Sequence, residues 1–199
     1  MKRILLIFAW LVCFAITAMA QAKYVFFFIG DGMGSNQVLA AEMYQAALKG
    51  EIGRVPLLMS QFPYSGQAAT FSASYGITDS AAAGTCLASG KKTNNGMIGQ
   101  TPDGELAISV ASQLKTEGWG VGIMSSVPVD HATPASHYAH AEKRYYYYKI
   151  GTQLTQSEFD FFGGGGFQSP TNKENAEDPN LYDLAREAGY TLVVYYEDA

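Results

Sequence analysis

Residues 24–34 read YVFFFIGDGMG, an apolar run that does not alternate with polar residues and that ends in a glycine-rich turn around Asp31. A continuous apolar run of this length is typical of a strand that is covered on both faces, as in a parallel α/β sheet. Residues 35–48 follow with Ser35 as an N-cap, good helix formers and Gly50 as a stop signal. The order strand, loop, helix predicts the first unit of an α/β fold.

The same alternation continues along the chain. We expect further strands at residues 65–72, 120–124, 158–162 and 191–196, and helices at residues 80–87, 106–115, 134–153 and 181–188. This order predicts a doubly wound, mostly parallel sheet flanked by helices, with its active site beyond the carboxyl ends of the strands. The loops that follow the strands are therefore where functional residues are expected.

The first 20 residues have the composition of a signal peptide. Lys2 and Arg3 precede an uncharged apolar run over residues 4–16, and Ala18-Met19-Ala20 follows as a cleavage signal. A membrane span needs roughly 20 apolar residues, so we expect cleavage near Ala20 and no stable membrane anchor. A lipoprotein signal around Cys13 is weaker, because Val12 stands where a small residue is expected. The hypothesis is a mature domain over residues 21–199 that is exported to the periplasm or secreted.

The charge balance excludes a nucleic-acid-binding surface. Lys2 and Arg3 are two of the 13 basic residues, so the mature chain keeps 11 against 18 acidic residues. A phosphate site in such a chain must gather positive potential locally, through cations, arginine or helix N-termini. Cys86 is the one cysteine outside the signal peptide, so no intrachain disulfide framework is expected, and a buried small residue is the simplest interpretation.

Asp31 lies between two glycines directly after the first expected strand, where the backbone turns tightly and an ion can approach the carboxylate. It is a natural ligand for zinc or for a hard cation. A cap on the following helix is an equally good interpretation of the pentapeptide. A dinucleotide site is disfavoured, because the spacing is G-x-G-x-G and Asp31 would repel a pyrophosphate.

Ser80 stands at the start of a helix of small residues, within Thr-Asp-Ser-Ala-Ala-Ala-Gly-Thr at residues 78–85. Backbone amides and the helix dipole there favour an anion or a serine alkoxide, although helix capping alone explains most such triplets. No G-x-S-x-G elbow is present, which disfavours a Ser-His-Asp triad. The S-x-x-K match at Ser89 lacks its companion motifs. Metal coordination is the remaining way to activate the hydroxyl.

A third group of candidates lies in and after the turn at residues 130–134, Asp-His-Ala-Thr-Pro. The turn follows an expected strand and offers oxygen and nitrogen donors, but Thr133 is also a good N-cap before Pro134. His137 and His140 are three apart on an expected helix, where a zinc pair is less common than a solvent-facing or capping pair. Arg144 has the forked guanidinium that grips phosphate, but an arginine beside Glu142 and Lys143 is, in isolation, far more often a surface charge.

Taken together these motifs resemble the alkaline phosphatase family in order and spacing. The resemblance rests on residues 29–34 (IGDGMG), 78–85 (TDSAAAGT), 131–134 (HATP) and 138–144, ending at Arg144. It implies an alkaline phosphatase-like fold and hydrolysis of small phosphomonoesters through a phosphoserine intermediate. Two zinc ions and one magnesium ion are implied as cofactors, and a homodimer is consistent with the resemblance.

The resemblance also implies a role for each matching residue. Ser80 is the expected nucleophile and a metal ligand, Asp79 orients Arg144, and Arg144 grips the phosphate. Asp31 bridges a zinc ion and the magnesium, and Thr133 binds magnesium through its hydroxyl. His131 stands where some members carry aspartate and others histidine, so the identity of the third metal is open.

The resemblance covers the N-terminal portion of the family, and the other expected metal ligands come from a region beyond residue 199. We therefore expect an incomplete fold and a chain that is a poor or inactive phosphatase by itself. A non-catalytic phosphate- or metal-binding remnant is the alternative hypothesis. A sulfatase is disfavoured, because Ser80 is followed by three alanines and not by x-Pro-x-Arg.

Overall fold

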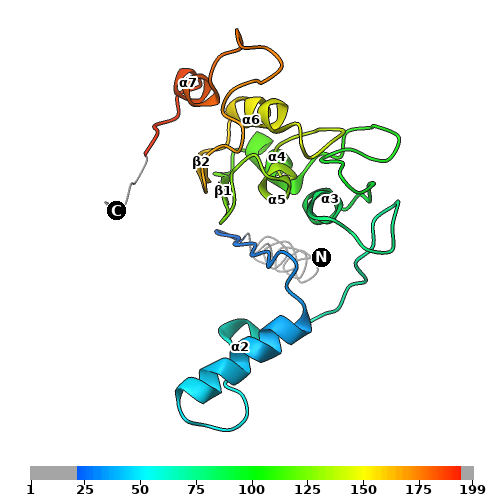
Figure 1. Cartoon of the computed structure of the whole chain (residues 1–199), viewed down its shortest axis with the longest axis vertical. Helices are drawn as coiled ribbons and strands as arrows, with labels where there is room; N and C mark the ends of the chain where they lie inside the picture. The colour runs from blue at the N-terminus through cyan, green and yellow to red at the C-terminus, as the bar shows by residue number, and fades with distance from the viewer. Residues whose placement is uncertain (1–21, 194–199) are drawn as a thin grey trace, which may run out of the picture. The chain divides into compact units, whose positions relative to one another are not determined.

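The computed structural model describes residues 22–193, and the predicted signal peptide at residues 1–20 lies outside this range. Residues 22–30 and the residues from Asp31 onward belong to two separate units. The second unit holds α2 (Ser35–Leu48), a 3-10 turn η1 (Leu58–Gln61), α3 (Ser80–Ser89), α4 (Val110–Thr116), β1 (Gly122–Met124), α5 (Ala132–Ala135), α6 (Tyr147–Gln156), β2 (Phe161–Gly163) and α7 (Leu181–Glu187) (Figure 1).

The described sheet is a parallel pair. Strand β1 pairs with β2 in register, with Gly122 opposite Phe161 and Met124 opposite Gly163. Two helices, α5 and α6, separate the strands in the sequence, which is the crossover that parallel pairing requires. The α/β class and the parallel sheet are confirmed, although both strands are shorter than the sequence predicts.

Three predicted strands do not form in the part of the chain that the structure describes. Residues 24–29, 65–72 and 191–193 carry no strand, and residues 194–196 lie outside the described range. The apolar run shows why: the side chains of residues 24–28 are 61–87% exposed. A strand of this kind needs cover on both faces, and the exposed side chains of residues 24–28 lack that cover in the part of the chain that the structure describes. The predictions of strands at 24–29 and 65–72 are therefore wrong for the described structure.

Two predicted helices differ from the structure by more than two residues at an end. Helix α4 begins at Val110 and not at Leu106, because Ser109 is its N-cap and accepts a hydrogen bond from the Ser112 amide at 3.0 Å. The segment predicted as helix over residues 134–153 is broken into α5 and α6. Between them Ala141 forms an antiparallel bridge with Ile98. The N–H and C=O groups of Ala141 bond to Ile98 in this bridge, so they are not available for the hydrogen bonds of a continuous helix.

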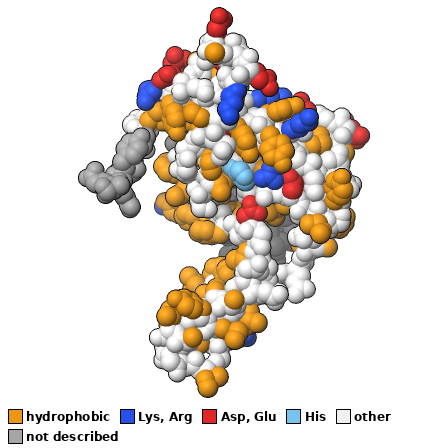
Figure 2. Space-filling model, viewed as in Figure 1, with side chains coloured by type: hydrophobic (Ala, Val, Ile, Leu, Met, Phe, Trp, Pro, Cys, Tyr) orange, Lys and Arg blue, Asp and Glu red, His pale blue; other side chains and the backbone are white. Residues whose placement is uncertain are grey.

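The core of the second unit lies between α3, α5, α6 and the two strands. Its fully buried side chains include Ala81, Ile98, Ala132 and Ile150. Helix α3 approaches α5 through Gly84, where an added Cβ would lie 2.6 Å from Oγ of Ser136. By contrast, α2 carries exposed apolar side chains along its length, at Leu39, Met43, Tyr44 and Leu48. Figure 2 shows much orange, hydrophobic surface over the part of the molecule that holds α2. None of the helices of residues 22–193 has the length and apolar character needed to cross a membrane.

The loops after β1 and β2 run together beyond the sheet. The Ser125 amide donates to Gly163 O at 2.9 Å, and the Val129 amide donates to Gly166 O at 2.9 Å. Glycine is required in this loop, because a Cβ at Gly164 would lie 2.8 Å from the carbonyl oxygen of Val127. The paired loops fix the backbone that leads into residues 130–134.

Candidate active site

Ser80 is the first residue of α3 and is presented by a capped helix end. The Asp79 carboxylate accepts a hydrogen bond from the Ala82 amide at 2.9 Å, so Asp79 is the N-cap. The first amides of a helix have no partner within the helix, and together with the helix dipole they favour a negative charge beside Ser80. The small neighbours Ala81 and Ala82 are buried and leave the helix end unobstructed by long side chains.

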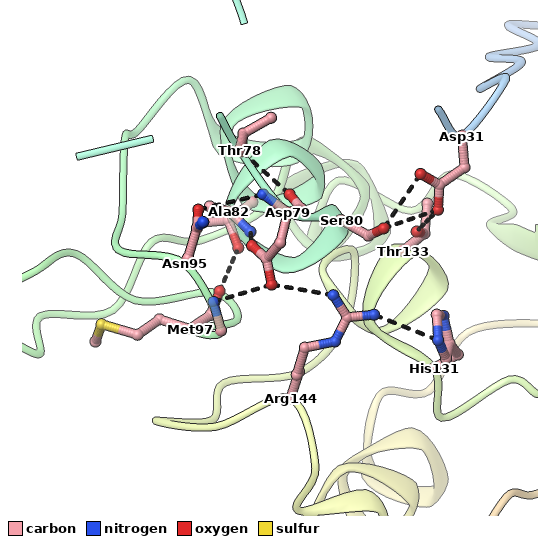
Figure 3. A network of polar contacts seen from close by, with 12 residues as sticks. Asp31, Thr78, Asp79, Ser80, Ala82, Asn95, Met97, His131, Thr133 and Arg144 are labelled. Carbon is pink, nitrogen blue, oxygen red and sulfur yellow. Dashed lines mark hydrogen bonds and ion pairs between the residues drawn. The ribbon is translucent and has the colours of Figure 1, made fainter. Parts of the chain in front are cut away.

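Asp31 brings two hydroxyl groups together. Its carboxylate oxygens lie 3.1 and 3.0 Å from Oγ of Ser80, and Oδ2 also accepts a hydrogen bond from Oγ1 of Thr133 at 2.9 Å (Figure 3). The three side chains come from the glycine-rich turn before α2, the start of α3 and the start of α5. They are 49 and 102 residues apart in the sequence, so only the fold can bring them into contact.

Arg144 lies between an acidic and an imidazole side chain. Its Nη1 donates to Oδ2 of Asp79 at 3.0 Å, and its Nη2 lies 3.3 Å from Nε2 of His131 (Figure 3). The ion pair is mostly shielded from solvent, with side chains 16% and 24% exposed. Two contacts of this kind hold the guanidinium plane in one orientation, which is what a bidentate grip on phosphate requires.

His131 faces Arg144 as a neutral ring. Burial and the Arg144 guanidinium lower the pKa of His131, against the opposing charges of Asp31 and Asp130. Because a guanidinium can only donate, Nε2 of His131 accepts and the ring proton lies on Nδ1. Within residues 22–193 this buried Nδ1 has no hydrogen-bond partner. A buried polar atom without a partner is unusual in a folded protein and is a reason to look for a functional role of His131.

Asp130, a candidate donor at the end of the strand, is engaged elsewhere. It is completely buried and accepts hydrogen bonds from the amides of Gln168 (2.8 and 3.0 Å) and Ser169 (3.2 Å). Burial raises the pKa of Asp130 in spite of these hydrogen bonds. Its carboxylate therefore fastens the loop after β2 to the loop that carries His131.

His137 and His140 do not form a zinc pair. Nδ1 of His140 lies 2.5 Å from the carbonyl oxygen of Gly99, and Nδ1 of His137 lies 3.2 Å from that of Thr133. The backbone of His140 is also held at both ends by the Gln153 side chain. The commoner alternative is a solvent-facing or capping pair. Both rings are half-buried and contact backbone carbonyl oxygens, so neither histidine simply faces solvent.

The sequence analysis missed Asn95 and Gly96. The Asp79 amide donates to Oδ1 of Asn95 at 3.2 Å, and the Gly96 amide donates to Oδ2 of Asp79 at 3.0 Å. The Gly96 carbonyl oxygen accepts a hydrogen bond from the Arg144 amide at 2.7 Å. An Asn-Gly pair signals a turn, but nothing in the sequence alone tells which distant residues the turn contacts.

The donor atoms around Asp31 fit magnesium better than zinc. A carboxylate and two hydroxyl groups are hard oxygen donors, which Mg²⁺ prefers, whereas zinc sites are built mainly from His, Cys and carboxylate ligands. Among residues 22–193, no three side chains of His, Cys, Asp or Glu gather in a group that could hold a metal ion. Asp31 and Thr133 fit a magnesium site, and the described residues do not supply the nitrogen donors of two zinc sites.

Comparison with known proteins shows the family of the chain. The model of the alkaline phosphatase family matches residues 22–193. Alkaline phosphatase 4 of Bacillus subtilis is 33% identical over 184 residues, which cover 87% of this chain and 38% of that protein. Alkaline phosphatase of Thermus thermophilus has a TM-score of 0.72 and 26% identity, over 82% of this chain and 34% of that chain.

A variant of the alkaline phosphatase from the Antarctic bacterium TAB5, solved with magnesium bound, has a TM-score of 0.59 and 25% identity. It is matched over 70% of this chain and 43% of its own. The present chain belongs to the alkaline phosphatase family. It spans between 26% and 44% of the length of the first three curated relatives that it matches.

Proposed function

We propose that this chain carries the nucleophile and the phosphate-binding arginine of a metal-dependent phosphomonoesterase that works through a phosphoserine intermediate. The observation that carries the proposal is the contact of Ser80 with Asp31 beside the Asp79 and Arg144 ion pair. Membership of the alkaline phosphatase family supports the phosphomonoester as substrate class.

The reaction follows from the position of Ser80. Its hydroxyl oxygen attacks the phosphorus of a phosphomonoester, the ester oxygen to phosphorus bond breaks, and the alcohol leaves after taking a proton. The hydroxyl proton of Ser80 is lost in this step, and Asp31 orients the hydroxyl by accepting its hydrogen bond. Water then attacks the phosphoserine, which releases inorganic phosphate and restores the hydroxyl.

Arg144 binds two non-bridging oxygens of the phosphate in this scheme, and Asp79 and His131 hold its guanidinium in place. The free amides at the start of α3 add partial positive charge on the same side. Both features place positive potential at the nucleophile in a chain whose net charge is −5. The chain therefore attracts phosphate locally, although its overall charge is negative.

Bound divalent cations would lower the pKa of the serine hydroxyl and neutralise charge on the transferred phosphoryl group. Asp31 and Thr133 are the residues proposed to hold magnesium, with Ser80 adjacent. The magnesium-bound structural neighbour supports this choice of cation. Two zinc ions are part of the proposal through the family alone, with Asp31 and Ser80 as residues that would contribute ligands. His131 is a candidate ligand of the third metal.

Export is also proposed for the chain. Its support is the sequence of residues 1–20, with two basic residues, an apolar run and an Ala-x-Ala signal. The partners proposed are small phosphomonoesters and, through the family, a second copy of the chain in a homodimer. N-terminal sequencing of the exported protein would find Gln21 at its start, and an uncleaved Met1 would contradict this proposal.

Hydrolysis of p-nitrophenyl phosphate with added zinc and magnesium tests the proposed activity. Wild type is compared with Ser80→Ala and with Ser89→Ala, which removes a hydroxyl from the other end of α3. We expect low activity in wild type and Ser89→Ala, because residues 22–193 supply few of the zinc donors, together with no activity in Ser80→Ala and loss of activity on chelation. No activity in wild type, with phosphate still bound, would favour the non-catalytic remnant. Full activity in Ser80→Ala would remove Ser80 as the nucleophile.

A further inference from the structure

The side chain of Asn95 spans the three residues that lead into the catalytic helix. Its Oδ1 accepts a hydrogen bond from the Asp79 amide at 3.2 Å, and its Nδ2 donates to the carbonyl oxygen of Ile77 at 3.0 Å. Both partners are 16 or more residues away in the sequence, so these contacts are not the local turn contacts that asparagine often makes. One amide group thus fixes the backbone immediately before Ser80.

The backbone of Gly96 makes further hydrogen bonds to the same region. Its amide donates to Oδ2 of Asp79, the oxygen that also receives Nη1 of Arg144, and its carbonyl oxygen accepts from the Arg144 amide. Gly96 has φ +87, a left-handed conformation that favours glycine. The position of Asn95 is itself fixed, because its backbone amide donates a hydrogen bond to Oγ of Ser74 at 3.0 Å. Residues 95 and 96 therefore connect the residue before Ser80 to the backbone of Arg144.

Few side chains meet the geometric demand at position 95. One short side chain must accept a hydrogen bond from the Asp79 amide and also donate one to the carbonyl oxygen of Ile77. Aspartate supplies only acceptors when ionised, and alanine supplies neither. The adjacent Asn94 has the same side chain, but it makes no side-chain hydrogen bond with residues 22–193, which provides a matched control one position away.

We propose that Asn95 is a positioning residue, which acts through Asp79 to aim Ser80 at the phosphate that Arg144 holds. The inference rests on the proposed function, because it assigns Asn95 a role in that reaction. A misplacement of about 1 Å at a reacting group can cost about 100-fold in rate. Asn95→Ala is therefore expected to lower kcat by about 10-fold to 100-fold. KM is expected to change little, since Arg144 keeps its side-chain contact with Asp79.

The first arm of the test is amide hydrogen exchange, measured by NMR on the metal-free chain, and it needs no catalysis. In Asn95→Ala the amides of Asp79 and Ala82 are expected to exchange about fivefold faster or more, the effect of one lost hydrogen bond. The α6 amides of Ile150 and Leu154 are expected to be unchanged, and Asn94→Ala should match wild type throughout. Unchanged exchange at Asp79, or an equal increase across α6, would overturn the proposal.

The second arm measures kcat and KM for p-nitrophenyl phosphate in the metal-loaded chain. Asn95→Asp keeps an acceptor for the Asp79 amide, so its Asp79 exchange should stay slow and its kcat should lie between those of wild type and Asn95→Ala. Wild-type kcat in both variants would overturn the inference. If Asn95→Ala is too unstable to be measured, wild-type kcat in Asn95→Asp would overturn it. If wild type shows no Ser80-dependent hydrolysis, the proposed function fails, while the exchange arm still decides whether Asn95 fixes this turn.

Discussion

The carboxylate of Asp31 contacts Oγ of Ser80 with both of its oxygens, at 3.1 and 3.0 Å, although 49 residues separate the two. Asp31 lies in the glycine-rich turn before α2 and Ser80 begins α3, so the contact joins two segments that are far apart in the sequence. The hydroxyl group of Thr133 also donates a hydrogen bond to the carboxylate of Asp31. This arrangement makes specific predictions about metal binding, phosphate binding and stability.

Asp31→Asn is expected to weaken magnesium binding by about tenfold or more, because a neutral amide replaces the one charged oxygen donor of the group. Isothermal titration of magnesium into the metal-free chain measures the change. Asp103→Asn, in an exposed turn, is the control and should bind as wild type does. Equal magnesium affinity in Asp31→Asn and wild type would show that the ion does not bind at Asp31.

Arg144→Lys is expected to weaken binding of inorganic phosphate by about 10-fold to 100-fold, the effect of losing one charge-assisted hydrogen bond of about 1.5–3 kcal/mol. Lysine keeps the charge but not the forked geometry that contacts Asp79 and His131. Titration of inorganic phosphate into the zinc- and magnesium-loaded chain measures the phosphate affinity. Arg186→Lys, in an exposed pair with Asp183, should leave the affinity unchanged. A similar loss in both variants would contradict the assignment.

Gly84→Ala is expected to destabilise the chain by about 1–3 kcal/mol, the usual cost of overpacking. Alanine in an open helix position would instead stabilise by up to about 1 kcal/mol, so the sign of the change is informative. The added Cβ would lie 2.6 Å from Oγ of Ser136, and removing that oxygen in Gly84→Ala/Ser136→Ala should recover part of the loss. Urea unfolding measures it, with Gly76→Ala, which meets no atom within 4 Å, as control. A stabilised Gly84→Ala would show that α3 and α5 are not closely packed.

The pKa of Asp160 is lowered by its hydrogen bond from Lys115 and by the Val121 amide. A carboxylate with a lowered folded pKa contributes stability that is present above its unfolded value and is lost as pH falls through the folded pKa. In Lys115→Met the pKa of Asp160 should therefore rise toward 3.8, and the stability that Asp160 contributes above its unfolded pKa should become smaller. A carboxyl carbon NMR titration measures the pKa. Lys91→Met is the control, and an unchanged Asp160 pKa in Lys115→Met would refute the ion pair.

The local motifs could be predicted from the sequence because each is encoded in contiguous residues. Residue types and order predict a helix that begins at Ser80, a cap within residues 78–80 and a parallel sheet. They leave open which of the three residues is the cap, and the structure shows that it is Asp79. The contact of Asp79 with Arg144, which the family resemblance implies, is present at 3.0 Å, while the catalytic role of each residue stays a prediction.

Long-range contacts could not be predicted in the same way. The lack of alternation in residues 24–29 predicted a covered strand, but cover depends on neighbours that a local pattern does not specify. Asn95 carried no signal beyond a turn, because its partners Ile77 and Asp79 are defined only by the fold. The break between α5 and α6 arises likewise from the bridge of Ala141 to Ile98.

Covalent labelling of Ser80 tests the central claim most directly. The metal-loaded chain is mixed with a phosphomonoester, quenched in acid and digested, and the peptide that contains residues 78–85 is analysed by mass spectrometry. The account predicts one added phosphoryl group on Ser80, absent from Ser80→Ala and from samples treated with chelator. Phosphomonoester hydrolysis in wild type without phosphate on Ser80, or with phosphate on another residue of that peptide, would contradict it.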